Sequence, residues 1–326
     1  MTLPIEHILG ILSDNLRLRG SVMPLSSRKA TAWANGLGLS KTHSTVLYTG
    51  HMYQLMPATE SLSRMMADME ATDAWPLRFM GMGRKINALI NTTQFMVRPD
   101  TEKEALFNRR LANIARLLQK AGVSFGYLYD RELYAGALLH DEGVDDVFED
   151  HARKVWAVLK KSGVTRVITV DPHTTHMLRH VYPQIIPEYD IEAVSYLEVL
   201  AKTSLAPSKK ITDDVVIHDS CVYARYEVVI NQPRELLDKA GLRLNEIENQ
   251  GAFTHCCGGP IESLFPKKAR AIAETRVKQL AASGCKKVVS MCPICLVNLQ
   301  HAANGNGTQI QDISDVLYDA YGGVSA

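Results

Sequence analysis

Amphipathic segments alternate with short apolar runs along most of this chain. Apolar residues at helical spacing, in series that stop near a glycine, predict helices, and the short apolar runs predict buried strands. The alternation predicts an α/β fold with small parallel sheets flanked by helices. The expected helices cover residues 5–18, 106–118, 145–161, 191–201, 266–282 and 313–321. The expected strands cover residues 45–49, 124–128, 167–170, 215–219 and 286–290.

The same order of elements occurs twice, which indicates a weak internal repeat. Three stretches correspond between the copies: His51 with Cys221, Tyr134-Ala135-Gly136 with Cys256-Cys257-Gly258, and Asp171-Pro-His-Thr with Cys292-Pro-Ile-Cys. We therefore expect an N-terminal arm at 1–44 and two tandem domains at 45–205 and 211–326, related by a pseudo-two-fold axis. The matching loops should lie at the carboxyl ends of parallel strands, where α/β sheets bind ligands.

Composition narrows the class of protein. Among 326 residues, 46% are apolar, and 36 basic residues balance 35 acidic ones, so no basic surface for nucleic acid or anionic membrane is expected. No apolar run is long enough to span a membrane, and the N-terminus lacks the features of an export signal. We expect a cytoplasmic protein. The Met-rich stretch near Met80–Met82 and the arm are expected to offer apolar surface to partner subunits.

The cysteines carry the strongest chemical signal. All six lie within 75 residues, and five follow the pattern C-x34-CC-x34-C-x2-C. Thiolates select soft metals, above all zinc and the iron of iron–sulfur clusters, and five exceed the four that a structural zinc site needs. The five are Cys221, Cys256, Cys257, Cys292 and Cys295. Cys285, which matches Val164 in the first copy, is expected to be a core residue.

The local context of these cysteines suits metal binding. Cys292 and Cys295 open a predicted helix, where free N–H groups and the helix dipole stabilise thiolates. Gly258 and Gly259 allow the backbone to approach a bulky inorganic core. Cys-x-x-Cys alone is equally compatible with a redox dithiol, but the distant Cys221 and the vicinal pair weigh against that interpretation.

This set of motifs resembles the cysteine-rich CCG domain of the heterodisulfide reductase B/D family. The resemblance covers about residues 42–321 as two tandem copies, and the second copy is the specific one. It implies a non-cubane [4Fe-4S] cluster held by the five cysteines, with a cubane [4Fe-4S] cluster or zinc as alternatives. In relatives with two complete motifs, paired clusters are implicated in splitting or forming a disulfide.

The first copy departs from the family pattern at every cysteine position, so an equivalent second cluster cannot form there. One interpretation is a scaffold that shapes the pocket and a subunit interface. The other is that His51, His173 or Asp171 acts on a substrate or on a mononuclear metal. In the second copy, His255 and His218 are each able to hydrogen-bond a sulfur or move a proton. Catalytic roles are thus expected for His255, His51 and Asp171.

The resemblance implies an oxidoreductase subunit that is active only in a complex. It would transfer electrons to or from a small disulfide, a persulfide or a carrier-bound thiol. Its partners would be ferredoxin-like and flavin-containing subunits, since this chain has no second four-cysteine motif. The alternatives are a structural or assembly subunit with zinc or a structural cluster, and a simple electron relay without a substrate of its own.

Overall fold

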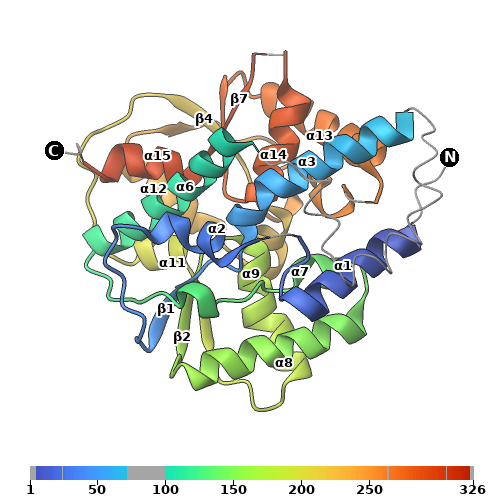
Figure 1. The fold of residues 1–326 in the computed structure, drawn as a ribbon. Helices are drawn as coiled ribbons and strands as arrows, with labels where there is room; N and C mark the ends of the chain where they lie inside the picture. Colours follow the sequence, from blue (N-terminus) through green and yellow to red (C-terminus); the bar gives the residue numbers. More distant parts are fainter. Residues whose placement is uncertain (1–4, 24, 72–99, 263, 306, 324–326) are drawn as a thin grey trace.

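Two small parallel sheets lie at the centre of the protein. The computed structural model describes residues 5–23, 25–71, 100–262, 264–305 and 307–323 (Figure 1). The first sheet has the strand order β1-β2-β3 and the second β5-β4-β6-β7, and every pair of neighbours is parallel. The strands are β1 (Thr45–Tyr48), β2 (Arg166–Thr169), β3 (Glu192–Ser195), β4 (Asp214–His218), β5 (Arg243–Leu244), β6 (Lys287–Ser290) and β7 (Gln309–Asp312).

Helices connect the strands and cover the sheets. The helices before the second sheet are α1 (Ile5–Arg19), α2 (Ser27–Thr31), α3 (Met52–Ala71), α6 (Thr101–Lys120), α7 (Ala137–Asp141), α8 (Asp145–Lys161), α9 (Pro172–His176), α10 (Tyr182–Ile185) and α11 (Tyr196–Ala201). Those that follow are α12 (Asn231–Lys239), α13 (Pro266–Ala281), α14 (Pro293–Ala303) and α15 (Ile313–Tyr321). Short 3-10 or π turns are η1 (Ala32–Ala34), η3 (Tyr129–Arg131), η4 (Met177–Val181), η5 (Tyr223–Glu227), η6 (Gly251–Phe253) and η7 (Gly259–Ile261).

The two sheets are built alike. The second strand of each sheet lies between the first and the third, and the registers Thr45↔Arg166 and Val215↔Lys287 align corresponding strands. Both faces of the first sheet are buried, because Leu47 faces the main core while Val46 and Tyr48 face a second cluster that α8 covers. This explains why the strands are nearly continuous apolar runs. The α/β fold class is confirmed; the pseudo-two-fold relation of the halves stays a prediction.

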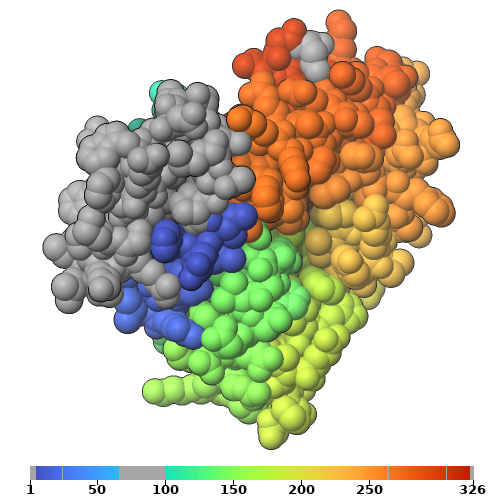
Figure 2. Space-filling model, turned by 90° about the vertical axis from the view of Figure 1, so that its right-hand side faces the viewer, coloured from blue at the N-terminus to red at the C-terminus, as the bar shows by residue number. Residues whose placement is uncertain are grey.

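One hydrophobic core extends through both halves of the chain. Helix α6 packs against α3 and α11 and also against the C-terminal helix α15. Two buried polar contacts join these elements: Tyr53 donates to Asp312 at 3.0 Å, and Arg110 donates to Asp315 at 2.8 Å. Helix α1 packs against α7 and α8, and Figure 2 shows its blue surface beside the green residues of the first half. The halves therefore meet over a broad, mostly apolar contact.

Two of the predicted elements are wrong. Residues 124–128 form no strand, because Gly126 makes only single bridges to Ser40 and Val46 before the chain turns at Tyr129, whose φ is 55°. The expected helix 191–201 begins only at Tyr196, and the residues before it form β3. Ser195 ends that strand and caps α11, since its side chain accepts the N–H of Leu197. The stretch at Met80–Met82 lies outside the described residues.

Candidate metal centre

The five cysteines of the motif come together at the carboxyl ends of β4 and β6. Cys221 follows β4, Cys292 and Cys295 open α14 directly after β6, and the vicinal pair lies in the loop between η6 and η7. The Sγ atoms of Cys257 and Cys295 are 3.0 Å apart. Further sulfur contacts join Cys221 to Cys256, Cys256 to Cys257, and Cys292 to Cys295. The contacts bring all five sulfur atoms into one group.

Burial differs within this set. Cys257, Cys292 and Cys295 are buried, whereas Cys221 and Cys256 are partly exposed. The exposed side of the centre is therefore the side of Cys221 and Cys256. Cys285 is also buried, but it packs into the hydrophobic core in the turn before β6.

Two glycines allow the cysteine loop to lie close to its neighbours. Gly258 has a φ of +80°, and a Cβ there would lie 2.5 Å from the carbonyl oxygen of Ala269. A Cβ on Gly259 would lie 2.2 Å from Cγ2 of Ile294 and 3.4 Å from the sulfur of Cys257. Such distances exclude a larger residue without movement of α13 or α14. The Cys-Cys-Gly-Gly sequence thus holds the vicinal sulfurs against the start of α14.

The thiols do not share one protonation tendency. Hydrogen bonds from Cys221, Cys257 and the Gly258 N–H lower the pKa of Cys256 to about 2, against the effect of burial. The pKa of Cys292 is also lowered, because contacts with Cys295 and His173 outweigh burial. The pKa values of Cys221, Cys257 and Cys295 are raised, chiefly by hydrogen bonds with neighbouring sulfurs and by burial. A cationic metal or cluster would let all five ionise, so the donor set fits such a group.

A buried arginine and a buried histidine form one wall of the centre. Arg276 donates through Nε to Nδ1 of His218 at 3.1 Å and through Nη1 to the carbonyl of Asn249 at 2.7 Å. Burial and the charge of Arg276 lower the pKa of His218 to about 3, so its ring is neutral. Burial lowers the pKa of Arg276 to about 10, which leaves it charged at neutral pH. His218, Cys257 and Cys295 place one ligand atom each within 4.8 Å of one another.

Our sequence analysis missed Arg276. It lies three residues after Ala273 on the predicted apolar stripe of α13, and it is fully buried. An arginine on an apolar helix face is itself a signal, because a buried guanidinium needs partners. Here it places a positive charge next to the sulfur atoms of Cys257 and Cys295.

An ion pair fixes the loop before the vicinal cysteines. Asp219 accepts both terminal nitrogens of Arg234, at 2.8 and 2.9 Å, and also the N–H of Gly251 at 2.7 Å. The carbonyl of Asp219 accepts the hydroxyl of Thr254 at 2.9 Å. Because Asp219 is buried, these bonds hold the loop rigidly two residues before Cys256.

The first half of the chain supplies a side chain to the cysteine centre. His173, in α9, hydrogen-bonds to Cys292, and its Nδ1 lies 3.1 Å from a carboxylate oxygen of Asp141. The pKa of His173 is raised well above its usual value, because the carboxylate and the sulfur outweigh burial. The contact between the halves thus runs from Asp141 through His173 to Cys292.

The other predicted residues lie in different surroundings. His255 is partly exposed and its Nδ1 lies 3.0 Å from the carbonyl of Cys256. Asp171 caps α9 by accepting the N–H of Thr174 at 2.9 Å, and burial raises its pKa to about 7. Burial and His151 lower the pKa of His51 to about 4, and neither of its ring nitrogens has a hydrogen-bond partner among the described residues.

The corresponding loops of the two halves share their backbone geometry. Gly136 has φ and ψ of 84° and −1°, and Gly258 has 80° and 0°. Asp171 and Cys292 are both extended N-cap residues followed by proline. In residues 45–65 and 100–205, however, no three His, Cys, Asp or Glu side chains approach one another as closely as His218, Cys257 and Cys295 do.

A narrow apolar cavity of about 60 Å³ adjoins the centre between the two halves. The first half contributes Tyr134 and His173, and the second contributes Gly259 and Ile294. These last two are in the segments that carry Cys257 and Cys292. Most of the remaining lining is apolar: Val22, Met52, Leu55, Met56, Ala137, Leu138, Pro260 and Val297. A ligand in this cavity would lie beside the cysteine loops in surroundings that exclude water.

Comparison with known proteins agrees with this geometry. Residues 215–300 match the family model described as a cysteine-rich domain, CCG. The chain carries a CCG domain. This confirms the resemblance for the second copy, and all five clustered cysteines lie inside the match.

Several relatives of the chain are oxidoreductases by name. The chain is 31% identical over 224 residues to EtfAB:quinone oxidoreductase of Syntrophomonas wolfei, covering 64% of this chain and 31% of that protein. It is 30% identical over 210 residues to the probable iron-sulfur-binding oxidoreductase FadF of Bacillus subtilis, covering 62% and 29%. It is 29% identical over 221 residues to the D chain of dihydromethanophenazine:CoB--CoM heterodisulfide reductase of Methanosarcina mazei, covering 64% and 54%. The chain thus matches about a third to a half of these relatives.

A crystal structure of a hypothetical protein from Helicobacter pylori has a similar fold. Its TM-score is 0.51 at 14% identity, and the match covers 66% of this chain and 46% of that one. Within the described part of the CCG chain, no helix has the length and apolar character needed to cross a membrane.

Proposed function

We propose that this chain is an iron–sulfur subunit of a heterodisulfide-reductase-like complex, which transfers electrons to or from a sulfur substrate. The convergence of five cysteine sulfurs beside a buried arginine carries the proposal. The names of the relatives support it, since they include one chain of a heterodisulfide reductase and an iron-sulfur-binding oxidoreductase.

We propose a non-cubane [4Fe-4S] cluster as the cofactor, held by Cys221, Cys256, Cys257, Cys292 and Cys295. Five contacting thiols exceed the four ligands of a cubane cluster or a structural zinc. The vicinal pair supports this choice, because adjacent cysteines are poorly placed to chelate one ion but are able to bind different irons. Arg276 would offset part of the negative charge of the thiolates and the cluster.

The substrate would be a disulfide, a persulfide or a thiol. Reduction of a disulfide consumes two electrons and two protons, breaks the S–S bond and yields two thiols; oxidation is the reverse. When bound, the cluster supplies one-electron transfer and iron with affinity for sulfur. The apolar cavity beside Gly259 and Ile294 would hold the substrate and exclude water. His173 would hold a hydrogen bond at Cys292, while catalytic roles for His255, His51 and Asp171 remain predictions.

The domain division and the partners belong to the same proposal. Residues 45–205 would be a CCG-type copy that has lost its cysteines, residues 211–326 the intact copy, and residues 1–44 an arm. Electrons would pass to or from ferredoxin-like and flavin-containing subunits, because two electrons must reach a disulfide one at a time. The first half would complete the pocket through Tyr134 and His173.

The decisive experiment is anaerobic purification with iron, sulfide and zinc determined in the same sample. Four irons and four sulfides per chain, with visible absorption that bleaches on reduction, are expected for the cluster. Addition of a disulfide should then change the EPR spectrum, and turnover should require a ferredoxin-like electron donor protein. A preparation with one zinc and no sulfide would contradict the proposal.

A structural zinc site is the second candidate. The observation that favours it is the close group of His218, Cys257 and Cys295, which has the spacing of a metal site. In that case the chain would be an assembly subunit. A cluster that shows no spectral response to thiols or disulfides would instead indicate an electron relay without its own substrate.

A further inference from the structure

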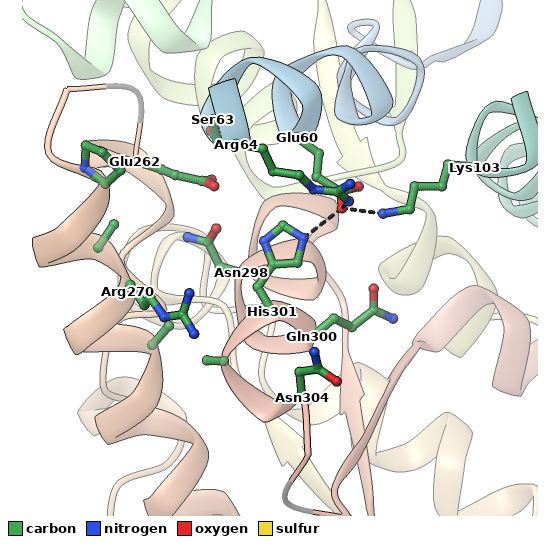
Figure 3. Close-up of a pocket in the computed structure, with 14 residues that line it drawn as sticks. Glu60, Ser63, Arg64, Lys103, Glu262, Arg270, Asn298, Gln300, His301 and Asn304 are labelled. Atoms are coloured by element: carbon green, nitrogen blue, oxygen red, sulfur yellow. Dashed lines mark hydrogen bonds and ion pairs between the residues drawn. The ribbon is translucent and has the colours of Figure 1, made fainter. Parts of the chain in front are cut away.

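A larger cavity, of about 430 Å³, lies next to the loop that carries the vicinal cysteines. Helices α3, α13 and α14 and the start of α6 surround it (Figure 3). Its volume is within the range of small-molecule sites, roughly 300–1,000 Å³. Unlike the narrow apolar cavity, it is lined largely by charged and amide side chains: Glu60, Arg64, Lys103, Glu262, Arg270, Asn298, Gln300, His301 and Asn304.

The charge at the upper side of this cavity is mainly positive. One carboxylate oxygen of Glu60 accepts from Arg64, from Lys103 and from His301, the last at 2.7 Å. Figure 3 shows these three side chains converging on Glu60 from three different elements. Only 3% of the Glu60 side chain is exposed, whereas 60% of Arg64 is exposed. A single buried carboxylate therefore faces two permanent cations and a histidine, and positive charge remains in excess.

Arg270 brings a third cation from the opposite wall, in α13. It pairs with Glu274 at 3.0 Å, and both side chains are largely exposed. Exposed pairs at this spacing are worth about 0–1 kcal/mol. An oxyanion in the cavity competes with Glu274 for the guanidinium at little cost. Figure 3 shows the guanidinium of Arg270 turned toward His301.

The remaining acidic residue of the lining, Glu262, has an amide partner. With the Asn298 amide oriented so that both of its ends are satisfied, it donates to Glu262 at 2.7 Å and accepts the N–H of Gly259 at 3.0 Å. Burial raises the pKa of Glu262, which disfavours its charged form. Glu262 therefore offsets less of the positive charge than an exposed glutamate would, and Asn298 connects the cavity to the cysteine loop.

We propose that this cavity binds a small molecule through an oxyanion group, a phosphate or a carboxylate, with Arg64, Lys103 and Arg270 as the cationic contacts. Arginine and lysine are suited to this role because their N–H groups form charge-assisted hydrogen bonds to oxyanions. The concave shape favours a small molecule over an acidic protein surface. The site is separate from the proposed sulfur chemistry and does not depend on it.

Calorimetric titration of the intact protein with inorganic pyrophosphate and with citrate, at ionic strength matched by chloride, tests the proposal. Saturable binding of at least one of the two is expected, and the comparison tells phosphate from carboxylate recognition. Arg64→Gln and Arg270→Gln should each weaken binding by about tenfold, the loss of one charge-assisted contact. Arg243→Gln is the matched control, since it removes an exposed ion pair of the same kind, with Asp214, on β4 and β5.

Absence of saturable binding of either anion up to roughly 10 mM, an affinity well below that of specific sites, would overturn the proposal. Equal affinity of the Arg270→Gln variant and the parent protein would overturn it as well, as would equal weakening by Arg243→Gln. Arg270→Gln removes only an exposed pair, so it stays informative if Arg64→Gln perturbs folding through Glu60. The metal content of each variant, measured in parallel, separates loss of anion binding from any failure of the proposed cluster.

Discussion

His173 in the first half of the chain hydrogen-bonds to Cys292 in the second half. The histidine belongs to the Asp-Pro-His-Thr segment, which corresponds in sequence to the Cys-Pro-Ile-Cys segment that it touches. Asp141 holds the other side of the ring at 3.1 Å. The half without cysteines therefore contributes to the environment of the centre and does more than cover it.

Replacing His173 should change the redox properties of the bound cluster. Hydrogen bonds to cluster sulfurs raise the reduction potential because they stabilise the more negative, reduced state. His173→Ala should lower the midpoint potential by roughly 40–60 mV, the equivalent of about 1–1.5 kcal/mol for one electron. An EPR-monitored redox titration measures it.

Two variants serve as controls for this prediction. His173→Gln retains a side-chain N–H and should restore part of the shift. His255→Ala should have less effect, because the ring of His255 contacts the carbonyl of Cys256 and not its sulfur. A midpoint potential unchanged in His173→Ala would show that the contact has no influence on the cluster.

Serine substitutions should divide the cysteines into two groups. Each of Cys221, Cys256, Cys257, Cys292 and Cys295 contacts another sulfur of the set, so each replacement should lower or alter the iron and sulfide content. Cys285→Ser is the internal control, because Cys285 lies in the core, and it should keep full metal content with a modest loss of stability. Full cluster retention in a variant lacking both Cys256 and Cys257 would refute the ligand assignment.

Close packing at Gly258 should be separable from its backbone conformation. Gly258 and Gly284 have nearly the same φ, +80° and +79°, but a Cβ at Gly258 would meet the Ala269 carbonyl at 2.5 Å, while Gly284 has open space. Gly284→Ala should cost only the conformational strain, about 1–2 kcal/mol. Gly258→Ala should cost clearly more and lower metal content. Denaturant unfolding and iron analysis of both variants measure this, and equal losses would exclude a packing role.

The elements that could be predicted from sequence are those with a strong pattern. Helix α8 (Asp145–Lys161) and helix α15 (Ile313–Tyr321) were predicted with their observed ends. The third strand of each sheet was missed. Strands β3 and β7 are only four residues long and run directly into capping residues, Ser195 and Asp312, of the helices that follow. Their apolar residues therefore merge with the helical stripe, and the pattern alone cannot place the boundary.

The cysteine centre could be predicted because ligand type and spacing are local properties of the sequence. Its charged surroundings could not. Arg276 was hidden in a helical stripe, and the pairing of Asp219 with Arg234 depends on how α12 packs beside β4. The contact of His173 with Cys292 depends on how the two halves meet, and the repeat does not specify that arrangement.

The buried carboxyl group of Glu132 should make stability depend on pH near neutrality. One of its oxygens accepts the N–H and hydroxyl of Thr49 and the N–H of Gly50, yet burial raises the pKa from 4.5 to about 7. A raised pKa means that the folded state binds the proton more tightly than the unfolded state. The free energy of unfolding should therefore fall as pH rises from 4.5 to about 7, by at most about 3 kcal/mol, and then level off.

Glu132→Gln tests this, because it removes the titrating group and keeps an acceptor oxygen for Thr49. The difference in free energy of unfolding between the variant and the parent protein should shift in favour of the variant between about pH 5 and about pH 8. Glu246→Gln is the control, since Glu246 is an exposed partner of Arg234 and its removal should give a smaller pH-dependent difference. Parallel pH profiles of the parent protein and Glu132→Gln would mean that Glu132 stays ionised in the fold, stabilised by its three hydrogen bonds more than burial opposes it.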